Sequence, residues 1–279
     1  MQIAVERAIE TMWNRYEEPL SLDEIANTAI LSKFYFSRVF RNLTGTSPGR
    51  FLSAVRLHQA KTMLLETDLS VTEISYRVGY NSLGTFTSRF TRSVSLSPAR
   101  YRALARAGLT ERAGAALSGG DRRTCAVQGS IHAPETGRPV RIYIGAFREP
   151  IVQGRPVACE ILDGPGRFTL RVPEGVWFIR AAVVAASDFP ALPWERRPLL
   201  VASGPELCVR HGHDNAPVRL AARPLTALDL PILLALPELD SPHQPACSLR
   251  DASALLDREV RSLPHREVGA LRTANGRDR

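Results

Sequence analysis

Apolar residues in the first hundred positions recur at the three- and four-residue spacing of helices, and the whole pattern occurs twice. The segment Leu20–Ala26 matches Leu69–Ser75 at an offset of 49 residues, and from Phe36 and Phe86 onward the match continues at an offset of 50. Self-similarity of this kind indicates two copies of one supersecondary unit. We therefore expect two equivalent helical units in this part of the chain.

Each unit is predicted to contain a short helix, a tight turn and a second helix. Ser21 and Ser70 each precede a glutamate by three residues, which is the spacing of a capping box at a helix start. In the second unit Gly79 supplies a turn with positive φ, and a polar cap at Asn81 or Ser82 opens the next helix. This succession is typical of a helix-turn-helix.

The second helix of the first unit has an apolar face and a polar face. The apolar face is expected to hold the residues at i, i+3, i+4 and i+7, which are Phe36, Val39, Phe40 and Leu43. The opposite face carries Phe34, Ser37, Arg38 and Arg41. Such a helix suits the major groove of DNA, which is about 12 Å wide, but it also fits the solvated face of a small helical bundle. Two such units in register favour DNA binding.

A long helix is predicted between the two units. Ser47 and Pro48 place a cap and a helix-compatible proline at its start. Its apolar stripe consists of Phe51, Leu52, Val55, Ala60, Met63 and Leu64. A rigid helix here would hold the two units at a fixed separation, which matters because adjacent major grooves on one DNA face lie about 34 Å apart.

Taken together, these residues resemble the AraC/XylS family of transcription regulators, over residues 1 to about 105. The matching positions are Tyr35 to Arg41, Thr44 to Pro48, Arg56, Ala60 to Leu64, Val78 to Tyr80, Phe86, Phe90, Ser97, Pro98, Tyr101 and Arg102. The resemblance implies a tandem helix-turn-helix domain that binds double-stranded DNA with one recognition helix per unit.

The resemblance also supplies candidate DNA-binding residues. In the first unit Phe34, Ser37 and Arg38 hold base-contacting positions, and Lys33 and Arg41 hold positions near phosphates. In the second unit the corresponding positions are Gly84, Thr87 and Ser88, and the set of candidates is completed by Asn81, Ser82 and Arg92.

Two residues depart from the family pattern. Gly84 stands inside the second recognition helix, where glycine costs about 1 kcal/mol relative to alanine, and its outward neighbours are short. We expect poor direct base reading by this helix. Ser95 stands where the family has the glycine that pairs with Gly45, so the final turn is expected to be either strained or differently shaped.

Beyond residue 124 the apolar period changes from helical to two, which predicts short strands. Apolar alternation is clearest at Val127 and Ile131, Val140 to Ile144, Val157 to Ile161, Phe168 to Val172, Trp177 to Val183, and Val218 and Leu220. The expected fold is multi-domain α plus β. It comprises an all-α tandem helix-turn-helix domain at 1–105, a linker at 106–124, an antiparallel β-sandwich at 125–240 and a polar tail at 241–279.

The strand-rich part has motifs of its own. Val127-x-Gly129-x-Ile131, the run Gly164 to Leu170 and the run Pro173 to Trp177 resemble a transthyretin-like or carboxypeptidase-regulatory-like domain. Domains of that kind are mostly accessory modules without catalysis, so the resemblance implies a binding or sensing role. Trp177, Phe178, Phe189 and Trp194 could line a ligand site, although the strand spacing of Trp177 favours the core.

Charge and candidate chemistry refine these expectations. The net charge is +8, with most of the excess in the helical part, which favours nucleic acid as partner. His211, His213 and Asp214 form a potential metal cluster, but a solvated turn is the simpler interpretation, and no catalytic motif is present. Cys125, Cys159, Cys208 and Cys247 are expected to be reduced and mostly buried.

No part of the sequence predicts export or membrane insertion. The longest apolar stretches, Val176–Ala186 and Leu228–Leu239, are interrupted and fall short of the ~20 residues that a membrane helix needs. The first residues lack the apolar run of a signal peptide. We expect a cytoplasmic protein.

Two functions remain open. The first is a sequence-specific transcription regulator whose sandwich senses an effector or mediates oligomerisation. Its expected partners are double-stranded DNA, RNA polymerase and a small-molecule or protein effector, with no cofactor, no metal and no membrane. The alternative is a protein- or carbohydrate-interaction module with a degenerate DNA-binding arm, for which Gly84, Thr87 and Ser88 are the argument. No residue favours an enzyme.

Overall fold

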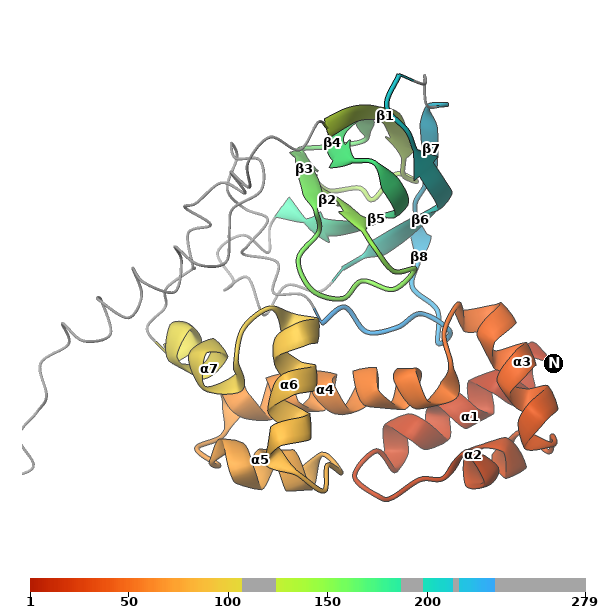
Figure 1. Ribbon diagram of the computed structural model, residues 1–279, viewed down its shortest axis with the longest axis vertical. Helices are drawn as coiled ribbons and strands as arrows, with labels where there is room; N and C mark the ends of the chain where they lie inside the picture. Colours follow the sequence, from red (N-terminus) through yellow and green to blue (C-terminus); the bar gives the residue numbers. More distant parts are fainter. Residues whose placement is uncertain (107–123, 187–197, 213–215, 234–279) are drawn as a thin grey trace, which may run out of the picture.

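The computed structural model describes residues 1–106, 124–186, 198–212 and 216–233. Helices occupy the N-terminal part and strands the C-terminal part, and Figure 1 shows the β-rich part stacked on one side of the helical part. The interior of the expected linker and the expected polar tail lie outside the described residues.

The helical part contains two similar units joined by a long helix. Its elements are α1 (Gln2–Asn14), α2 (Leu22–Thr28), α3 (Lys33–Thr44), α4 (Pro48–Glu66), α5 (Val71–Arg77), α6 (Leu83–Val94) and α7 (Pro98–Arg106). Both predicted capping boxes are present. The Ser21 Oγ accepts the Glu24 amide at 3.2 Å, the Glu24 carboxylate accepts the Ser21 amide at 2.7 Å, and Ser70 and Glu73 repeat this pair.

The helix α4 belongs to the cores of both units. Phe51, Leu52 and Val55 pack in the first-unit cluster with residues of α1, α2 and α3. Ala54, Leu57, Ala60 and Leu64 pack in the second-unit cluster with residues of α5, α6 and α7. Because α4 is buried from two sides, it fixes the position of one unit relative to the other, as the apolar stripe indicated.

One predicted core position in α3 is wrong. Phe36 and Phe40 are fully buried and Val39 is half-buried, but Leu43 is 38% exposed. The last turn of α3 extends beyond the first-unit cluster, so the buried stripe is one residue shorter than the helical period predicted.

At two equivalent turns with positive φ, one unit has glycine where the other has a residue with a side chain. Gly79 (φ 81°) corresponds to Ile30 (φ 56°) after α2, and Gly45 (φ 72°) corresponds to Ser95 (φ 72°) after α6. The left-handed conformation costs a residue with a Cβ roughly 1–2 kcal/mol. The expected strain at Ser95 is therefore present, and Ile30, a β-branched residue, shares it.

We expect Ile30→Gly to stabilise the protein by about 0.5–1 kcal/mol, because relief of the left-handed strain exceeds the entropy that glycine adds to the unfolded chain. The Ile30 side chain is 82% exposed, so little packing is lost. Ser95→Gly should act in the same direction. Chemical denaturation measures the change, and Ile30→Ala is the control because it removes the same packing without relieving φ. An equal gain from alanine would contradict the explanation.

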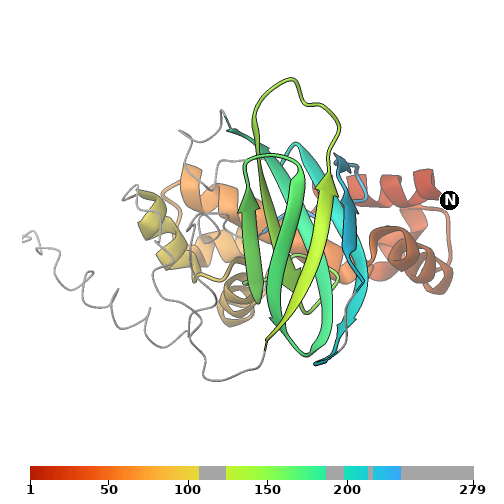
Figure 2. The same ribbon diagram turned by 90° about the horizontal axis from the view of Figure 1, so that it is seen from above.

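The strands of the β domain form two sheets. They are β1 (Thr124–His132), β2 (Val140–Phe147), β3 (Ala158–Leu162), β4 (Gly166–Pro173), β5 (Gly175–Ala185), β6 (Leu200–Val209), β7 (Val218–Ala221) and β8 (Arg223–Pro224). One sheet has the order β4-β1-β7 and the other β3-β2-β5-β6-β8. Figure 2 shows the strands of both sheets running past the helical part.

The two sheets enclose a common core. Val127 of β1, Leu170 of β4 and Leu220 of β7 meet Ile144 of β2 and Ile179 of β5 in one buried cluster. The expectation of a wholly antiparallel arrangement is wrong for one pair, since β1 pairs with β7 in parallel. The chain reaches β7 after crossing to the other sheet through β5 and β6, so β7 enters beside β1 in the same direction.

Trp177 and the cysteines test the remaining expectations for this domain. Trp177 is 2% exposed within the common core, and its indole N–H donates to the Pro173 carbonyl at 2.7 Å. It is a core residue, as its strand spacing favoured, and Phe189 and Trp194 of the predicted ligand site lie outside the described residues. Cys125 is half-buried, whereas Cys159 and Cys208 are exposed, so the expectation of mostly buried thiols is wrong for these residues. Strand alternation places both exposed thiols outside the common core.

The chain returns from the β domain to the helical part. Residues 225–233, which we call the crossing segment, run between the five-stranded sheet and α4 (Figure 1). Leu228 and Leu230 pack on the first-unit cluster, and Leu230 and Leu233 pack with the second-unit cluster. On the other side, Ile232 meets Tyr143 and Phe147 on the outer face of the sheet.

A loop between β2 and β3 makes two further contacts with the helical part. Glu149 forms an ion pair with Arg50 at the start of α4. The Gly154 amide donates to the Ser93 carbonyl near the end of α6 at 3.1 Å. This loop therefore contacts both units, as the crossing segment does.

Candidate nucleic-acid interface

The outer face of α3 presents the side chains expected for DNA recognition. Phe34 is 76% exposed, Arg38 and Arg41 are exposed, and Ser37 is half-buried. Phe36 and Phe40 anchor the opposite face of the helix in the first-unit cluster. The exposed face thus offers an apolar ring, a hydroxyl and two guanidinium groups.

Lys33 is engaged within the chain. Its Nζ lies 3.2 Å from the Asp23 Oδ1 and 5.7 Å from the centroid of the Phe34 ring. Both charged side chains are substantially exposed, so the ion pair contributes little to stability. A phosphate that approaches the start of α3 would compete with Asp23 for this ammonium group.

The face of α6 is made of short side chains. The helix begins at Leu83, so Gly84 lies in its first turn and not in its interior. The Ser82 Oγ caps the helix by accepting the Thr85 amide at 3.2 Å. A Cβ added at Gly84 would meet this Oγ at 3.8 Å, an ordinary contact, so the helix has room for a side chain there.

The other candidates in the second unit are accessible. Asn81, Ser82, Ser88 and Arg92 are exposed, and Thr87 is half-buried. Figure 2 shows α3 and α6 on the same side of the helical part, away from α1. The structure therefore places the two candidate recognition helices on one side of the helical part.

Arg89 was not among the candidates, although it lies on α6. Its guanidinium donates to the Ser53 Oγ of α4 at 3.3 Å, and the Ser53 Oγ in turn lies 3.0 Å from the Tyr80 hydroxyl. Arg89 is thus directed toward α4. Its position three residues before Arg92, the basic residue in the last turn of α6, gave no signal of this contact.

Arg56 makes hydrogen bonds to the first unit and lies against an aromatic ring of the second. From α4, its side chain donates to the carbonyls of Tyr16 and Glu18, each at 2.7 Å, and its guanidinium lies 5.9 Å from the centroid of the Tyr80 ring. A Cβ at Gly79 would lie 2.9 Å from this guanidinium. The family pattern named Arg56 and Gly79 separately; the structure shows that the glycine makes room for the arginine.

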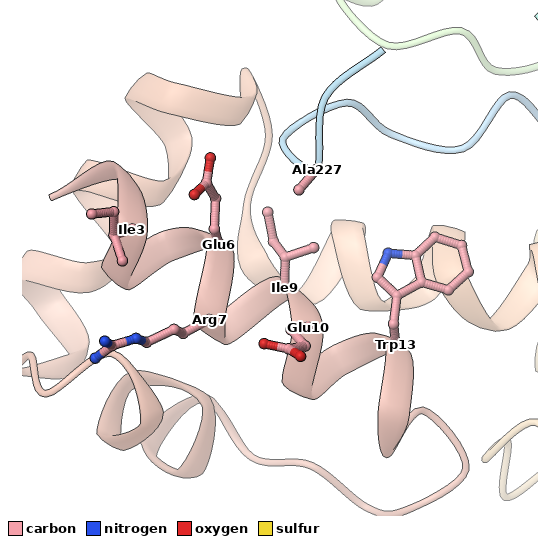
Figure 3. Close-up of a pocket in the computed structure, with 7 residues that line it drawn as sticks. All are labelled: Ile3, Glu6, Arg7, Ile9, Glu10, Trp13 and Ala227. Carbon is pink, nitrogen blue, oxygen red and sulfur yellow. The ribbon is translucent and has the colours of Figure 1, made fainter.

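A shallow depression lies where the crossing segment passes α1. Figure 3 shows Ile9 and Trp13 directed from α1 toward Ala227, and Ile3, Glu6, Arg7 and Glu10 complete the lining. It is open to solvent and combines two acidic groups with one basic group. It offers no convergent set of polar groups for a ligand.

The described residues do not form a metal site around His211. His213 and Asp214 lie outside the described residues. The His211 Nδ1 lies 3.5 Å from the Cys125 Sγ, and within the described ranges no group of three potential ligands comes together. Separately, none of the described helices is both long and apolar enough to cross a membrane.

Two units of helix, turn and helix on a shared helix, each with an exposed polar face on its second helix, define a tandem helix-turn-helix protein. The sequence profile described as "Helix-turn-helix domain" matches residues 25–104. The probable transcription factor PqrA of Proteus vulgaris is 33% identical over 94 residues, which cover 34% of this chain and 76% of that protein. The chain belongs to the AraC family of helix-turn-helix transcriptional regulators.

Other relatives match a similar share of the chain. An HTH-type transcriptional regulator of Haemophilus influenzae is 40% identical over 81 residues, which cover 29% of this chain and 27% of that protein. The DNA-binding domain of AdpA, solved in complex with a target DNA, is 33% identical with a TM-score of 0.36, and the match covers 37% of this chain and 93% of that domain. The chain thus spans about a quarter of the length of its Haemophilus relative.

Proposed function

We propose that this protein is a sequence-specific DNA-binding transcription regulator that places α3 and α6 in two adjacent major grooves of one duplex. The observation that supports this most is the sharing of α4 by the two cores. A helix buried from both sides keeps the two recognition helices at one separation and one angle. Two reading helices in fixed register favour a single geometry on DNA, which is what specific recognition of adjacent grooves requires.

The two recognition helices have different roles in this proposal. In α3, Arg38 is long enough to reach guanine with two parallel hydrogen bonds, and Phe34 provides apolar contact with a thymine methyl. In α6, Thr87 and Ser88 are short and reach phosphates better than base edges. The first half-site is therefore read directly, whereas the second is selected by groove shape and deformability.

Replacement of Arg38 tests the proposal. Arg38→Ala should weaken binding to the specific site by about 1–3 kcal/mol and leave binding to random DNA nearly unchanged, because a base contact is lost and a phosphate contact is not. Affinity is measured at one salt concentration, since unmatched salt would mask the contrast. Arg41→Ala is the matched control, for which we expect equal losses on both kinds of DNA.

The site itself is obtained by substituting every base pair across the bound duplex. Large penalties should gather under α3 and small ones under α6. Equal losses for Arg38→Ala on specific and random DNA would reassign this residue to phosphate contact and would remove the argument for direct reading by the first unit.

In this proposal the β domain acts as a sensor or as an oligomerisation domain. Its two sheets around a common core fit a β-sandwich of the transthyretin-like kind. The crossing segment and the β2–β3 loop each contact both helical units. An effector that shifts the β domain could thus alter the register of α3 and α6, and through it the contact of the bound protein with RNA polymerase.

A further inference from the structure

The outer face of the three-stranded sheet is basic throughout its described residues. Its outward positions carry Arg167 and Arg171 from β4 and Arg219 from β7, all exposed. The other outward residues are uncharged or a histidine: Thr124, Ala126, Gln128, Ser130, His132, Thr169 and Ala221. No carboxylate lies on this face of the described strands.

Strand register fixes where the three arginines lie. Ser130 of β1 is the pairing partner of Arg167 on one side and of Arg219 on the other. These two arginines are therefore two strand spacings apart, about 10 Å. Arg171 lies four residues beyond Arg167 on the same strand, about 13 Å away. The three guanidinium groups therefore lie on one face of the sheet, and the side chains between them are short hydroxyls and an amide.

The carboxylates that border this face are engaged elsewhere. Asp163 in the β3–β4 turn pairs with Arg141 at 3.0 Å. Glu160 of β3 accepts the Thr169 amide at 2.6 Å, and Glu174 accepts the His211 amide. Among the described residues, none of the three arginines forms an ion pair with these acids.

We propose that this sheet face is a second DNA-binding surface, which takes the phosphate backbone of a duplex without regard to sequence. Guanidinium groups bind phosphate oxygens bidentately, and serine, threonine and glutamine side chains are common phosphate donors. Apart from His132 at one end of β1, the outward positions of the described strands hold no aromatic side chain on which an unpaired base could stack, which favours a duplex over a single strand. Its flatness suits backbone contact and not entry into a groove.

This surface serves a duplex segment other than the one on α3 and α6. The five-stranded sheet lies toward the helical part, where Ile232 of the crossing segment covers it, and the three-stranded sheet is on the far side (Figure 1). One chain would thus hold two stretches of DNA on two different faces, and this inference goes beyond operator recognition. A protein that binds two duplex segments in this way would bring distant or flanking stretches of DNA together.

Capture of a second duplex tests the proposal with the full chain. An immobilised specific duplex is loaded with protein, and retention of a labelled random duplex is measured over a range of salt concentrations. We expect retention whose logarithm falls with log salt at a slope of about −3, since three phosphate contacts contribute ~0.9 each. The triple variant R167Q/R171Q/R219Q should lose retention at least tenfold and keep its affinity for the first duplex.

Two control variants keep the result interpretable. Replacing the same three residues by lysine retains charge and should retain capture to within a few-fold. R7Q/R138Q/R148Q removes three exposed arginines elsewhere and should behave as the wild type. Capture through dimerisation of the protein would survive in R167Q/R171Q/R219Q, so undiminished capture by that variant overturns the proposal.

Two further outcomes separate this proposal from neighbouring ones. If polyglutamate of equal charge displaces the random duplex more effectively than unlabelled duplex does, the face is a site for acidic protein and the proposal is wrong. If α3 and α6 do not bind DNA specifically, Arg38→Ala will not change the affinity for any duplex. Loss of random-duplex binding in R167Q/R171Q/R219Q would still show that the sheet face binds DNA.

Discussion

Leu233→Ala is expected to lower the free energy of unfolding by about 2–5 kcal/mol, the range for removing a fully buried leucine side chain. Leu233 is 1% exposed and packs within the second-unit cluster, although it is the last described residue after the β domain. The substitution leaves a cavity between the crossing segment and the second-unit helices. Urea denaturation of the full chain measures the loss, and Leu225→Ala is the control.

Leu225 belongs to the same segment but is 40% exposed, so its replacement should change stability by less than about 0.5 kcal/mol. The location of the effect is as informative as its size. Leu228 packs on the first-unit cluster and Leu233 in the second. Amide hydrogen exchange should therefore accelerate in α2 and α3 for Leu228→Ala, and in α5 and α7 for Leu233→Ala. If either variant accelerated exchange equally in both units, the two leucines would not pack on separate cores.

This packing changes how the two domains are expected to unfold. The sequence suggested two halves with independent cores joined by a linker, and the separate clusters of the helical part and the β domain agree with that. The crossing segment, however, covers both helical cores with leucines that arrive from the β domain. We expect the helical part to lose stability when the chain is cut before residue 225, even where it still folds.

The elements that sequence alone predicted well are those set by local physics. The capping boxes at Ser21 and Ser70 depend on residues three positions apart, and both are present. The alternation of the buried Trp177 and Ile179 with less buried neighbours needs only the pleat of a strand. The repeat offset also predicted the correspondence of Gly45 with Ser95, whose equal φ of 72° shows that the backbone kept its turn when the side chain changed.

What the sequence did not predict depends on contacts between distant segments. The run that begins at Leu228 was recognised as apolar and as too short for a membrane helix, yet its composition does not say which core it covers. The parallel pairing of β1 with β7 depends on the path of the whole chain through both sheets. The contact of Arg89 with Ser53 joins two helices whose relative position no local pattern determines.

Lys61, which contacts the crossing segment, should make the free energy of unfolding depend on pH. Its ammonium donates to the Leu233 carbonyl at 3.0 Å and lies 5.7 Å from the centroid of the Tyr101 ring. Burial lowers the pKa of Lys61 from 10.5 to about 8. The same surroundings raise the pKa of the buried Tyr101 hydroxyl. The chain has two lysines, Lys33 and Lys61, and its other cationic side chains are arginines and histidines.

We expect the free energy of unfolding to rise as the pH increases from about 8 toward 10. Below pH 8 Lys61 is protonated in both states and the cost of burying its charge is constant. Above pH 8 the native state releases this proton while the unfolded state, with a pKa of 10.5, still holds it. Unfolding then takes up a proton, so stability increases with pH, by at most about 1.4 kcal/mol per pH unit. Above about pH 10 the native state retains the Tyr101 proton that the unfolded state loses, and stability falls again.

Lys61→Met isolates this effect, because it keeps an unbranched side chain of similar length and removes the titrating group. The difference in stability between the wild type and this variant should narrow or reverse in favour of the wild type between pH 8 and pH 10, since contributions of cysteines and Tyr101 are common to both proteins. Methylation of the amines with ¹³C labels the α-amino group as well as Lys33 and Lys61, and one of the two lysine NMR signals should titrate near pH 8. A constant stability difference across this range, with both signals titrating above pH 10, would show that the Lys61 ammonium remains in contact with water and that the crossing segment does not enclose it.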